Sequence, residues 1–347
     1  MINAETKNEV NLKSLLGWMA TGAGVALAAG ALYKLATRFR VEGKVVLITG
    51  GSRGLGLELA RHLAAKGAKL AICARSEDQL GRARAELSES GADVIAIPTD
   101  ITNRSEVNEL VSDVVSHFGR IDVLINNAGV IQVGPQEEMN IEDYEEAMDT
   151  NFWAALYGMH AVIPHFIGQG GGRIVNITSI GGKVAVPHLL PYSASKFALV
   201  GLSEGMHAEL KKKNIYVTTV VPNLMRTGSP RNVTVKGDHE AEYAWFKVAD
   251  SSPLLSQSIE SAAREIIRAM EYGEAEAILS LSARVAVLLK GFAPGWVSTL
   301  TALTNHFLPE TGPSGSVPRK GFQSESSKSK GFISALSDRA AIRNNEL

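Results

Sequence analysis

The chain has 347 residues, of which 45% are hydrophobic and 20% charged, and its formal net charge is −1. This composition predicts a globular core of one large or two average domains, and the balanced charge excludes an electrostatic case for nucleic-acid binding. A single cysteine, Cys73, excludes an intrachain disulfide and a multi-cysteine zinc site. The histidines lack ligand spacing such as H-E-x-x-H, so we expect no metal.

An uncharged run of 18 residues extends from Leu15 to Leu32 within the N-terminal segment 1–40. It is long enough to span a bilayer. Lys34 and Arg38 follow it, and this basic excess predicts a membrane anchor with the rest of the chain in the cytoplasm. The alternatives are a cleaved signal peptide, whose basic residues normally precede the apolar run, an amphipathic helix, and a subunit contact in a soluble cytoplasmic protein.

Short β-branched runs alternate with helical patterns over residues 41–281. Strands are predicted at Lys44–Thr49, Lys69–Ala74, Val94–Pro98, Val123–Asn126, Arg173–Thr178, Ile215–Val221 and Ala277–Leu281. Helices are predicted at Glu58–Lys66, Glu77–Ser90, Ser105–His117, Glu142–Phe166, Tyr192–Lys213 and Ile259–Tyr272. This alternation predicts an α/β domain with a doubly wound, parallel, seven-stranded sheet of Rossmann type, arranged in three α/β/α layers.

The chain changes character after the last predicted strand. Residues 282–308 are apolar, but Lys290, Pro294 and Gly295 interrupt them. We expect one or two helices there, packed on the domain or lying on a membrane. Residues 309–347 are rich in Gly, Ser, Lys and Pro, which predicts a disordered tail.

A glycine-rich segment, Thr49–Gly56, joins the first predicted strand to the first predicted helix. A turn at this position directs backbone N–H groups and a helix N-terminus toward an anion, and glycine lets the backbone approach a pyrophosphate closely. We therefore expect a dinucleotide to contact Gly50, Ser52, Arg53, Gly54, Leu55 and Gly56. The missing G-K-[ST] ending excludes a Walker A loop, and the plain alternative is a tight turn without a ligand.

Arg75 follows the second predicted strand, 21 residues after Gly54 (75 − 54), where an NAD site usually carries an acidic residue. Arg53 adds a second guanidinium in the loop. Two arginines suit the 2′-phosphate of NADP(H), which we favour over NAD(H). The alternative is that both arginines are simply solvated.

Tyr192 and Lys196 are four residues apart in Y-S-A-S-K, so they share one face of a predicted helix. A neighbouring ammonium favours the phenolate and lowers the tyrosine pKa. The pair is therefore a candidate general acid and base. Considered alone, it could equally be an ordinary pair on a helix surface.

Together these motifs resemble the short-chain dehydrogenase/reductase family over roughly Gly43 to Leu281. The resemblance rests on five features in order: T-G-G-S-R-G-L-G at Thr49–Gly56, Asn126-Asn127-Ala128-Gly129, Asn151, Ser179 and Y-S-A-S-K at Tyr192–Lys196. Ser179 precedes Tyr192 by 13 residues (192 − 179), which is the usual gap in the family.

The resemblance implies a role for each catalytic position. Tyr192 would exchange the proton with the carbonyl oxygen, and Ser179 would polarise that oxygen. Lys196 would bind the nicotinamide ribose, and Asn151 would hold a water in a proton relay. Further cofactor contacts are implied at Asp100, Ile101, Asn127, Ala128, Gly129, Tyr192, Lys196, Pro222 and Thr227. The chain departs from the family at Pro222-Asn223, where Pro-Gly is common.

Two further features concern the substrate. The region Ser229–Asp250 falls where the family has its substrate loop, and its aromatic residues Tyr243, Trp245 and Phe246 could cap an apolar pocket or belong to a packed surface helix. His188 could line the substrate entrance or be a solvated loop residue.

We therefore expect a membrane-anchored, NADP(H)-dependent oxidoreductase that interconverts a ketone and a secondary alcohol. The apolar features suggest a lipid-like substrate, such as a 3-oxoacyl, steroid or retinoid-type compound. The alternative is a non-catalytic dinucleotide-binding redox sensor or membrane scaffold. The resemblance also implies a homodimer or homotetramer formed through the helices that carry Asn151 and Tyr192.

Overall fold

The computed structural model describes residues 38–251, 256–312, 315–329 and 334–346. The described residues from Arg40 onward belong to one compact unit. The predicted anchor at Leu15–Leu32 lies outside the described residues. Within the described ranges, no helix combines the length and hydropathy that a membrane span requires.

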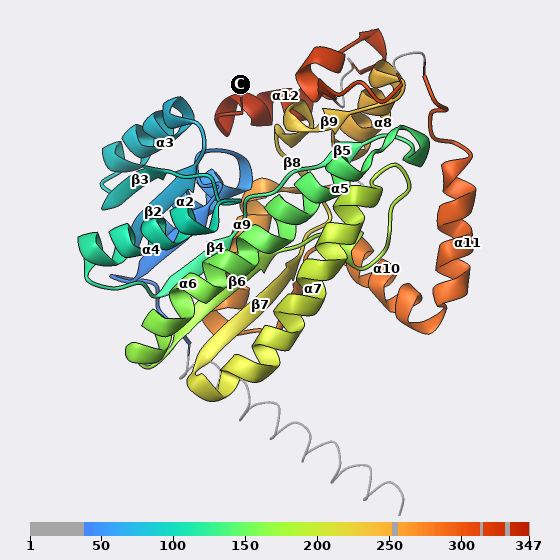
Figure 1. Cartoon of the computed structure of the whole chain (residues 1–347). Helices are drawn as coiled ribbons and strands as arrows, with labels where there is room; N and C mark the ends of the chain where they lie inside the picture. The colour runs from blue at the N-terminus through green and yellow to red at the C-terminus, as the bar shows by residue number, and fades with distance from the viewer. Residues whose placement is uncertain (1–37, 252–255, 313–314, 330–333, 347) are drawn as a thin grey trace, which may run out of the picture. The chain divides into compact units, whose positions relative to one another are not determined.

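A seven-stranded parallel sheet forms the centre of this unit, in the order β11-β7-β6-β4-β1-β2-β3 (Figure 1). Its strands are β1 (Val45–Thr49), β2 (Lys69–Ala74), β3 (Val94–Pro98), β4 (Val123–Asn126), β6 (Gly172–Ile177), β7 (Ile215–Val221) and β11 (Glu276–Ile278). The strand order reverses between β1 and β4, and such a switch point opens a crevice at the carboxyl ends of the strands. The predicted doubly wound, seven-stranded sheet is confirmed.

Helices cover both faces of the sheet: α2 (Gly54–Ala64), α3 (Glu77–Glu89), α4 (Arg104–Phe118), α6 (Ala154–Gly168), α7 (Leu190–Leu210) and α9 (Ile259–Tyr272). Figure 1 shows α4, α6 and α7 in front of the sheet, with α9 behind it. The single helix predicted over Glu142–Phe166 is instead α5 (Ile141–Met148), a π-helical turn (Asp149–Trp153) and α6. Such turns are frequent at functional sites, and this one carries Asn151.

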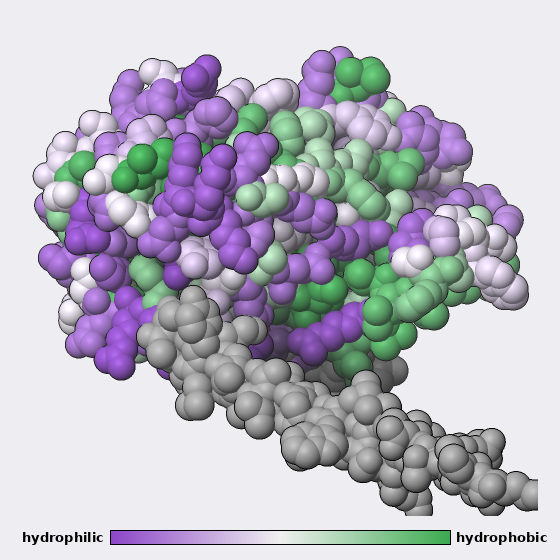
Figure 2. Space-filling view, turned by 90° about the horizontal axis from the view of Figure 1, so that it is seen from below, coloured by the Kyte–Doolittle hydropathy of each residue, from purple (hydrophilic) through white to green (hydrophobic). Residues whose placement is uncertain are grey.

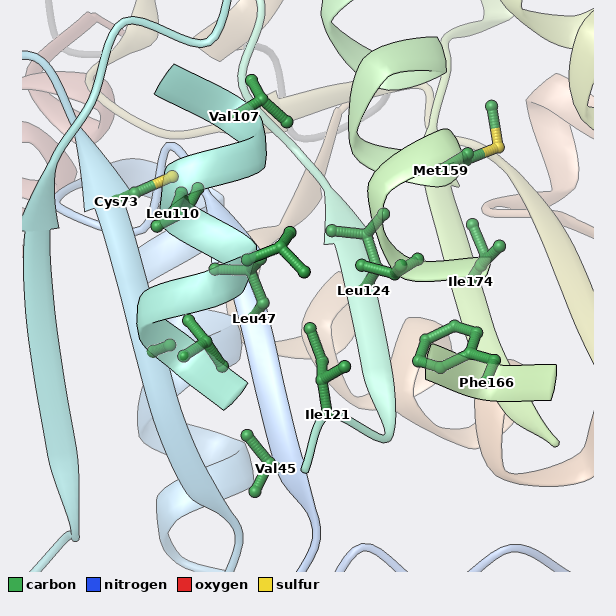
Figure 3. Packing of buried hydrophobic residues seen from close by; sticks show 14 of the residues in the cluster. Val45, Leu47, Cys73, Val107, Leu110, Ile121, Leu124, Met159, Phe166 and Ile174 are labelled. Carbon is green, nitrogen blue, oxygen red and sulfur yellow. The ribbon is translucent and has the colours of Figure 1, made fainter. Parts of the chain in front are cut away.

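The main core lies between the sheet and helices α4 and α6. Figure 3 shows side chains of β1, β4 and β6 meeting those of the two helices. Phe166 of α6 is fully buried, and a Cβ at Gly172 of β6 would lie 2.3 Å from its ring. Glycine is therefore required where the ring crosses the strand. Cys73 is also fully buried, and burial raises its thiol pKa to about 12, so we expect this thiol to be unreactive.

Several smaller elements escaped the sequence patterns. Helix α8 (His239–Ser251) is the packed helix that was one alternative for the region Ser229–Asp250, and the elements without a sequence signal are the strands β5 (Gln132–Val133), β8 (Leu224–Arg226), β9 (Thr234–Val235), β10 (Ser256–Ser258) and β12 (Arg319–Lys320). Three of them form a second sheet in the order β12-β9-β5. Two-residue strands carry too little periodicity to be recognised in a sequence.

Two helices follow the main sheet, α10 (Leu281–Phe292) and α11 (Pro294–Asn305), as expected for this apolar segment. Much of their apolar surface faces outward, and Figure 2 shows hydrophobic residues gathered over this part of the unit. The exposed side chains are Leu281, Val285, Leu288, Leu289, Phe292, Trp296, Leu300 and Leu303.

The expectation of a disordered tail over residues 309–347 is wrong for its described residues. Strand β12 pairs with β9, and α12 (Ser334–Arg343) packs against α8. Ala341 and Asn344 are completely buried. The composition was misleading because the few residues that order this segment find their partners in the main domain, far away in the sequence.

Candidate active site

A cavity of about 750 Å³ opens at the carboxyl ends of the strands, at the switch point of the sheet. This volume is typical of a small-molecule site. The cavity brings together most of the site residues predicted from the sequence: Gly50, Ser52, Arg53, Gly54, Leu55, Arg75, Asp100, Ile101, Asn127, Ala128, Gly129, Ser179, Tyr192, Lys196, Pro222 and Thr227. Gly56 and Asn151 are buried and are not among the residues that line this cavity.

The glycine-rich segment, called the phosphate loop from here on (Thr49–Gly56), is braced from beneath by Asn127. The Asn127 amide donates to the carbonyl oxygens of Thr49 at 3.0 Å and Gly50 at 3.1 Å. Gly50 and Gly54 have φ angles of +64° and +55°, a region that favours glycine. A Cβ at Gly56 would lie 2.1 Å from the Gly50 carbonyl oxygen. The loop is thus a close-fitting cradle that only glycine permits.

Two cations stand beside the phosphate loop. Arg75 is exposed, whereas Arg53 is partly buried and hydrogen-bonds to Asn232. Burial lowers the pKa of Arg53, and the nearby charge of Arg75 lowers it further. The two guanidiniums are therefore close enough to interact, and an anion between them would relieve their repulsion.

Ser179, Tyr192 and Lys196 meet where β6 ends and α7 begins. A hydrogen bond joins the Tyr192 and Ser179 side chains. The Lys196 ammonium donates to the Ile177 carbonyl oxygen at 2.9 Å and lies 5.7 Å from the centre of the Tyr192 ring. Burial lowers the pKa of Lys196 to about 8. A phenol, a hydroxyl and an ammonium thus face one small volume.

The expected lowering of the Tyr192 pKa is not met in this structure. Burial raises the pKa of the phenol, and its hydrogen bond with Ser179 opposes that effect. The charge of Lys196 is visible in the sequence, whereas the desolvation of a tyrosine deep in a cleft exists only in the folded chain.

Asn151 connects the π-helical turn to the start of α7. Its side chain accepts from the Val130 N–H at 3.0 Å and donates to the Ser195 hydroxyl at 2.9 Å. Ser195 in turn donates to the Tyr192 carbonyl oxygen at 2.8 Å. A Cβ at Gly129 would lie 2.7 Å from Asn151 Oδ1 and 3.5 Å from Lys196 Nζ. Ser195 and Gly129 therefore hold these groups in position, and both lie in motifs that the sequence shows, Y-S-A-S-K and Asn126-Asn127-Ala128-Gly129.

Apolar side chains line the other end of the cavity: Val186, Leu189, Met225, Trp245 and Phe246. Trp245 and Phe246 come from α8, so this helix contributes to the lining of the pocket. The same helix also packs into a second hydrophobic core, in which Tyr243 is fully buried. His188 does not line the cavity and is only 7% exposed. It is buried and pairs with Glu242 at 2.7 Å, and Glu242 accepts from the Trp245 indole at 2.6 Å.

The departure at Asn223 does not disturb the site. Its φ is not positive, so this turn needs no glycine. The Asn223 amide donates to the Ser282 hydroxyl at 2.9 Å and so links β7 to the start of α10. Thr227 still lines the cavity and bonds to Ser229 at 2.7 Å.

Comparison with known proteins agrees with this geometry. The short chain dehydrogenase family model matches residues 44–236. The chain is 34% identical over 271 residues to a Mycobacterium tuberculosis protein named as the oxidoreductase SadH, covering 77% of this chain and 98% of that protein. It is 36% identical over 262 residues to the Arabidopsis thaliana protein 11-beta-hydroxysteroid dehydrogenase-like 2, covering 75% and 81%.

A solved structure shows the same arrangement. The gluconate 5-dehydrogenase from Burkholderia cenocepacia, in complex with NADP and tartrate, superposes with a TM-score of 0.63 at 26% identity, covering 72% of this chain and 98% of that chain. The fold, the family match and the relatives agree, and the protein belongs to the short-chain dehydrogenase family of oxidoreductases.

Proposed function

We propose that this protein is an NADP(H)-dependent oxidoreductase that interconverts a ketone and a secondary alcohol. The observation that carries the proposal is the meeting of Ser179, Tyr192 and Lys196 in the same cleft as the phosphate loop. A folded preparation that binds NADPH but turns over no member of a panel of linear, cyclic and steroid-like ketones would contradict it.

The phosphate loop is the feature that makes the cleft suitable for a dinucleotide. The phosphate loop allows close approach at Gly50 and Gly54, and the start of α2 directs N–H groups into the cleft. Asp100 and Ile101 line the cavity at the end of β3, where the adenine would lie. When bound, the nicotinamide supplies the hydride chemistry, which no side chain can supply.

The side chains then manage the proton. In reduction, the Tyr192 phenol donates its proton to the carbonyl oxygen, and in oxidation the phenolate accepts it. The Ser179 hydroxyl donates a hydrogen bond that stabilises the oxygen as it becomes negative. Lys196 remains mostly cationic near neutrality because its pKa is about 8, so its charge favours the phenolate during turnover. Asn151 holds the first turn of α7 in place through Ser195.

The preference for NADP(H) predicts a selective effect of Arg75. Replacing Arg75 with alanine should weaken NADPH binding by about ten- to a hundredfold, the value of a charge-assisted hydrogen bond. NADH binding should change little because NADH lacks the 2′-phosphate. Fluorescence titration with both cofactors measures the effect, with Arg84→Ala as the matched control at another exposed arginine. An equal loss for the two cofactors would show that Arg75 does not read the phosphate.

The substrate end of the cavity supports a lipid-like ketone. Its lining contains several apolar side chains, and Trp245 is held in place through Glu242. Burial of apolar surface would dominate the binding of such a substrate. We propose a substrate with an extended hydrophobic part, such as a 3-oxoacyl, steroid or retinoid-type compound.

We also propose that the chain is anchored to a membrane through Leu15–Leu32, with the catalytic unit in the cytoplasm. The run of 18 uncharged residues and the exposed apolar side chains of α10 and α11 support this. In the expressing cell, the full chain should stay in the membrane fraction after an alkaline wash, and a variant lacking residues 1–37 should be released. Release of both proteins would contradict the anchor.

A further inference from the structure

The C-terminal end of the chain, called the strap (residues 334–346), docks beside the cofactor cleft. Helix α12 lies on α8, where the hydroxyls of Ser337 and Ser251 are 2.7 Å apart and buried. Lys247, only 1% exposed, pairs with Asp338 at 2.8 Å. A Cβ at Gly228 would lie 2.5 Å from the Ala341 Cβ. The strap is therefore anchored by buried contacts, next to the loop that carries Thr227.

Beyond α12 the strap reaches the phosphate loop itself. The Gly54 N–H donates to the Asn344 carbonyl oxygen at 2.9 Å. The Asn345 amide donates to the carbonyl oxygens of Ser52 at 2.8 Å and Gln79 at 3.0 Å. Gly54 begins α2, so Asn344 takes the place of an acceptor at a helix N-terminus, where a phosphate oxygen binds in a dinucleotide site.

Glu346 enters a small site built for an acidic group. Its carboxyl oxygens accept from the Gly228 N–H at 3.0 Å and from the Asn232 amide at 2.9 Å. Arg53 attracts it electrostatically, and the residue is only 5% exposed. Glu346 lines the same cavity as Gly54 and Tyr192. A carboxyl group thus occupies the side of the cleft that the phosphate loop prepares for an anion.

We propose that the strap is an autoinhibitory element that competes with the phosphates of the dinucleotide for the phosphate loop. This inference rests on the proposed function, because it assumes that the cleft binds a dinucleotide. The Gly54 N–H cannot serve Asn344 and a phosphate oxygen equally well, and the Glu346 carboxyl and a phosphate group would compete for the same place beside Arg53. Cofactor binding therefore requires the strap to leave, and the apparent Kd equals the intrinsic Kd divided by the fraction of molecules in which the strap is undocked.

Two features keep the docked strap easy to displace. The Asn344 side-chain nitrogen is buried without a hydrogen-bond partner, which costs free energy in the docked state. Glu346 is desolvated, and this burial raises its pKa to about 7 even though Arg53, the Gly228 N–H, Asn232 and Arg231 oppose the shift. Many contacts thus stabilise the docked strap, while Asn344 and Glu346 near its C-terminal end reduce that stability.

The raised pKa of Glu346 gives docking a pH dependence. A free glutamate titrates near 4.3, so the docked carboxyl binds a proton more tightly than the free one. The groups facing it are Arg53 of the phosphate loop, Arg231, and Asp250 of α8. Burial raises the pKa of Asp250 well above its usual value, and the nearby Glu346 raises it further. Docking is therefore most favourable at low pH and weakens as the pH rises through about 7.

Affinity for NADPH tests the competition. We compare the full chain with a variant ending at Arg343 and with Glu346→Ala, using Arg339→Ala on the exposed side of α12 as the matched control. The Kd should fall by about tenfold in the first two variants and stay unchanged in the control. The difference between the full chain and the shortened variant should be larger at pH 6 than at pH 8. Glu346→Gln, which keeps the acceptor without the titrating proton, should lose this pH dependence. An unchanged or weaker affinity in both Arg343-terminated and Glu346→Ala proteins would overturn the proposal.

Hydrogen exchange distinguishes a failure of this inference from a failure of the proposed function. The Gly54 amide should be protected in the full chain and exchange faster in the shortened variant, and NADPH should increase exchange in the strap. If neither protein binds NADPH or NADH while Gly54 protection still depends on the strap, the proposed function fails and the docking stands. If Gly54 protection does not depend on the strap while NADPH binds, the autoinhibitory role fails and the proposed function stands.

Discussion

Replacing Tyr192 with phenylalanine is expected to lower kcat for carbonyl reduction by about 10²- to 10⁴-fold, the usual contribution of a general acid. The substitution removes only the phenol oxygen, and the ring remains in place beside Lys196 and Gly181. Because the phenol transfers a proton and does not hold the phosphates, the Kd for NADPH should stay near that of the parent protein. Steady-state kinetics with a ketone substrate, together with a titration of NADPH binding, measure both effects.

Tyr157→Phe provides the matched control for this prediction. Tyr157 lies on α6 and stacks on Trp153 with ring centres 6.3 Å apart, outside the cleft. Its hydroxyl has no part in the proposed chemistry, so kcat should not change. Full activity of the Tyr192→Phe protein would remove the phenol from the mechanism and with it the role given to Ser179.

Gly56→Ala should abolish cofactor binding, with an increase in Kd of at least about a hundredfold. The added Cβ would lie 2.1 Å from the Gly50 carbonyl oxygen and 2.6 Å from the Asn127 amide nitrogen, so the phosphate loop must shift. We also expect a loss of about 1–3 kcal/mol in the free energy of unfolding, as for other overpacked sites. Titration with NADPH and chemical denaturation measure the two effects.

Gly81→Ala is the control for this substitution. Gly81 lies in the middle of α3 and a Cβ there meets nothing within 4 Å. Alanine is the better helix former, so this variant should bind NADPH normally and gain up to about 1 kcal/mol in stability. Normal NADPH binding by the Gly56→Ala protein would show that the loop is not the cradle described above.

The repeated alternation of strands and helices made most of the fold predictable. Most strands of the main sheet are short runs of largely buried apolar residues, and local patterns of this kind need no knowledge of distant contacts. The π-helical turn around Asn151 was not predictable, because one extra residue in a turn leaves the helical pattern of Glu142–Phe166 unbroken. The short strands β5, β9 and β12 depend on pairing across the chain, which no local pattern reveals.

The sequence predicted which residues form the site better than it predicted their pKa values. The cavity does gather Ser179, Tyr192 and Lys196, but the pKa of the phenol depends on burial, which a sequence does not contain. The strap shows the same limit more strongly, since Asn345 and Ser52 are 293 residues apart and meet only in the folded chain. The homodimer or homotetramer implied by the family resemblance stays a prediction.

Transfer of a label from the cofactor to the product tests the central claim most directly. The protein is incubated with a ketone substrate and NADPH carrying deuterium at the reactive position of the nicotinamide ring, and the alcohol is analysed by mass spectrometry. We predict one deuterium at the carbinol carbon of the product, in equal amount to the NADP formed. Oxidation of NADPH without deuterium in an alcohol product would contradict the assignment of this protein as a ketone and secondary-alcohol oxidoreductase.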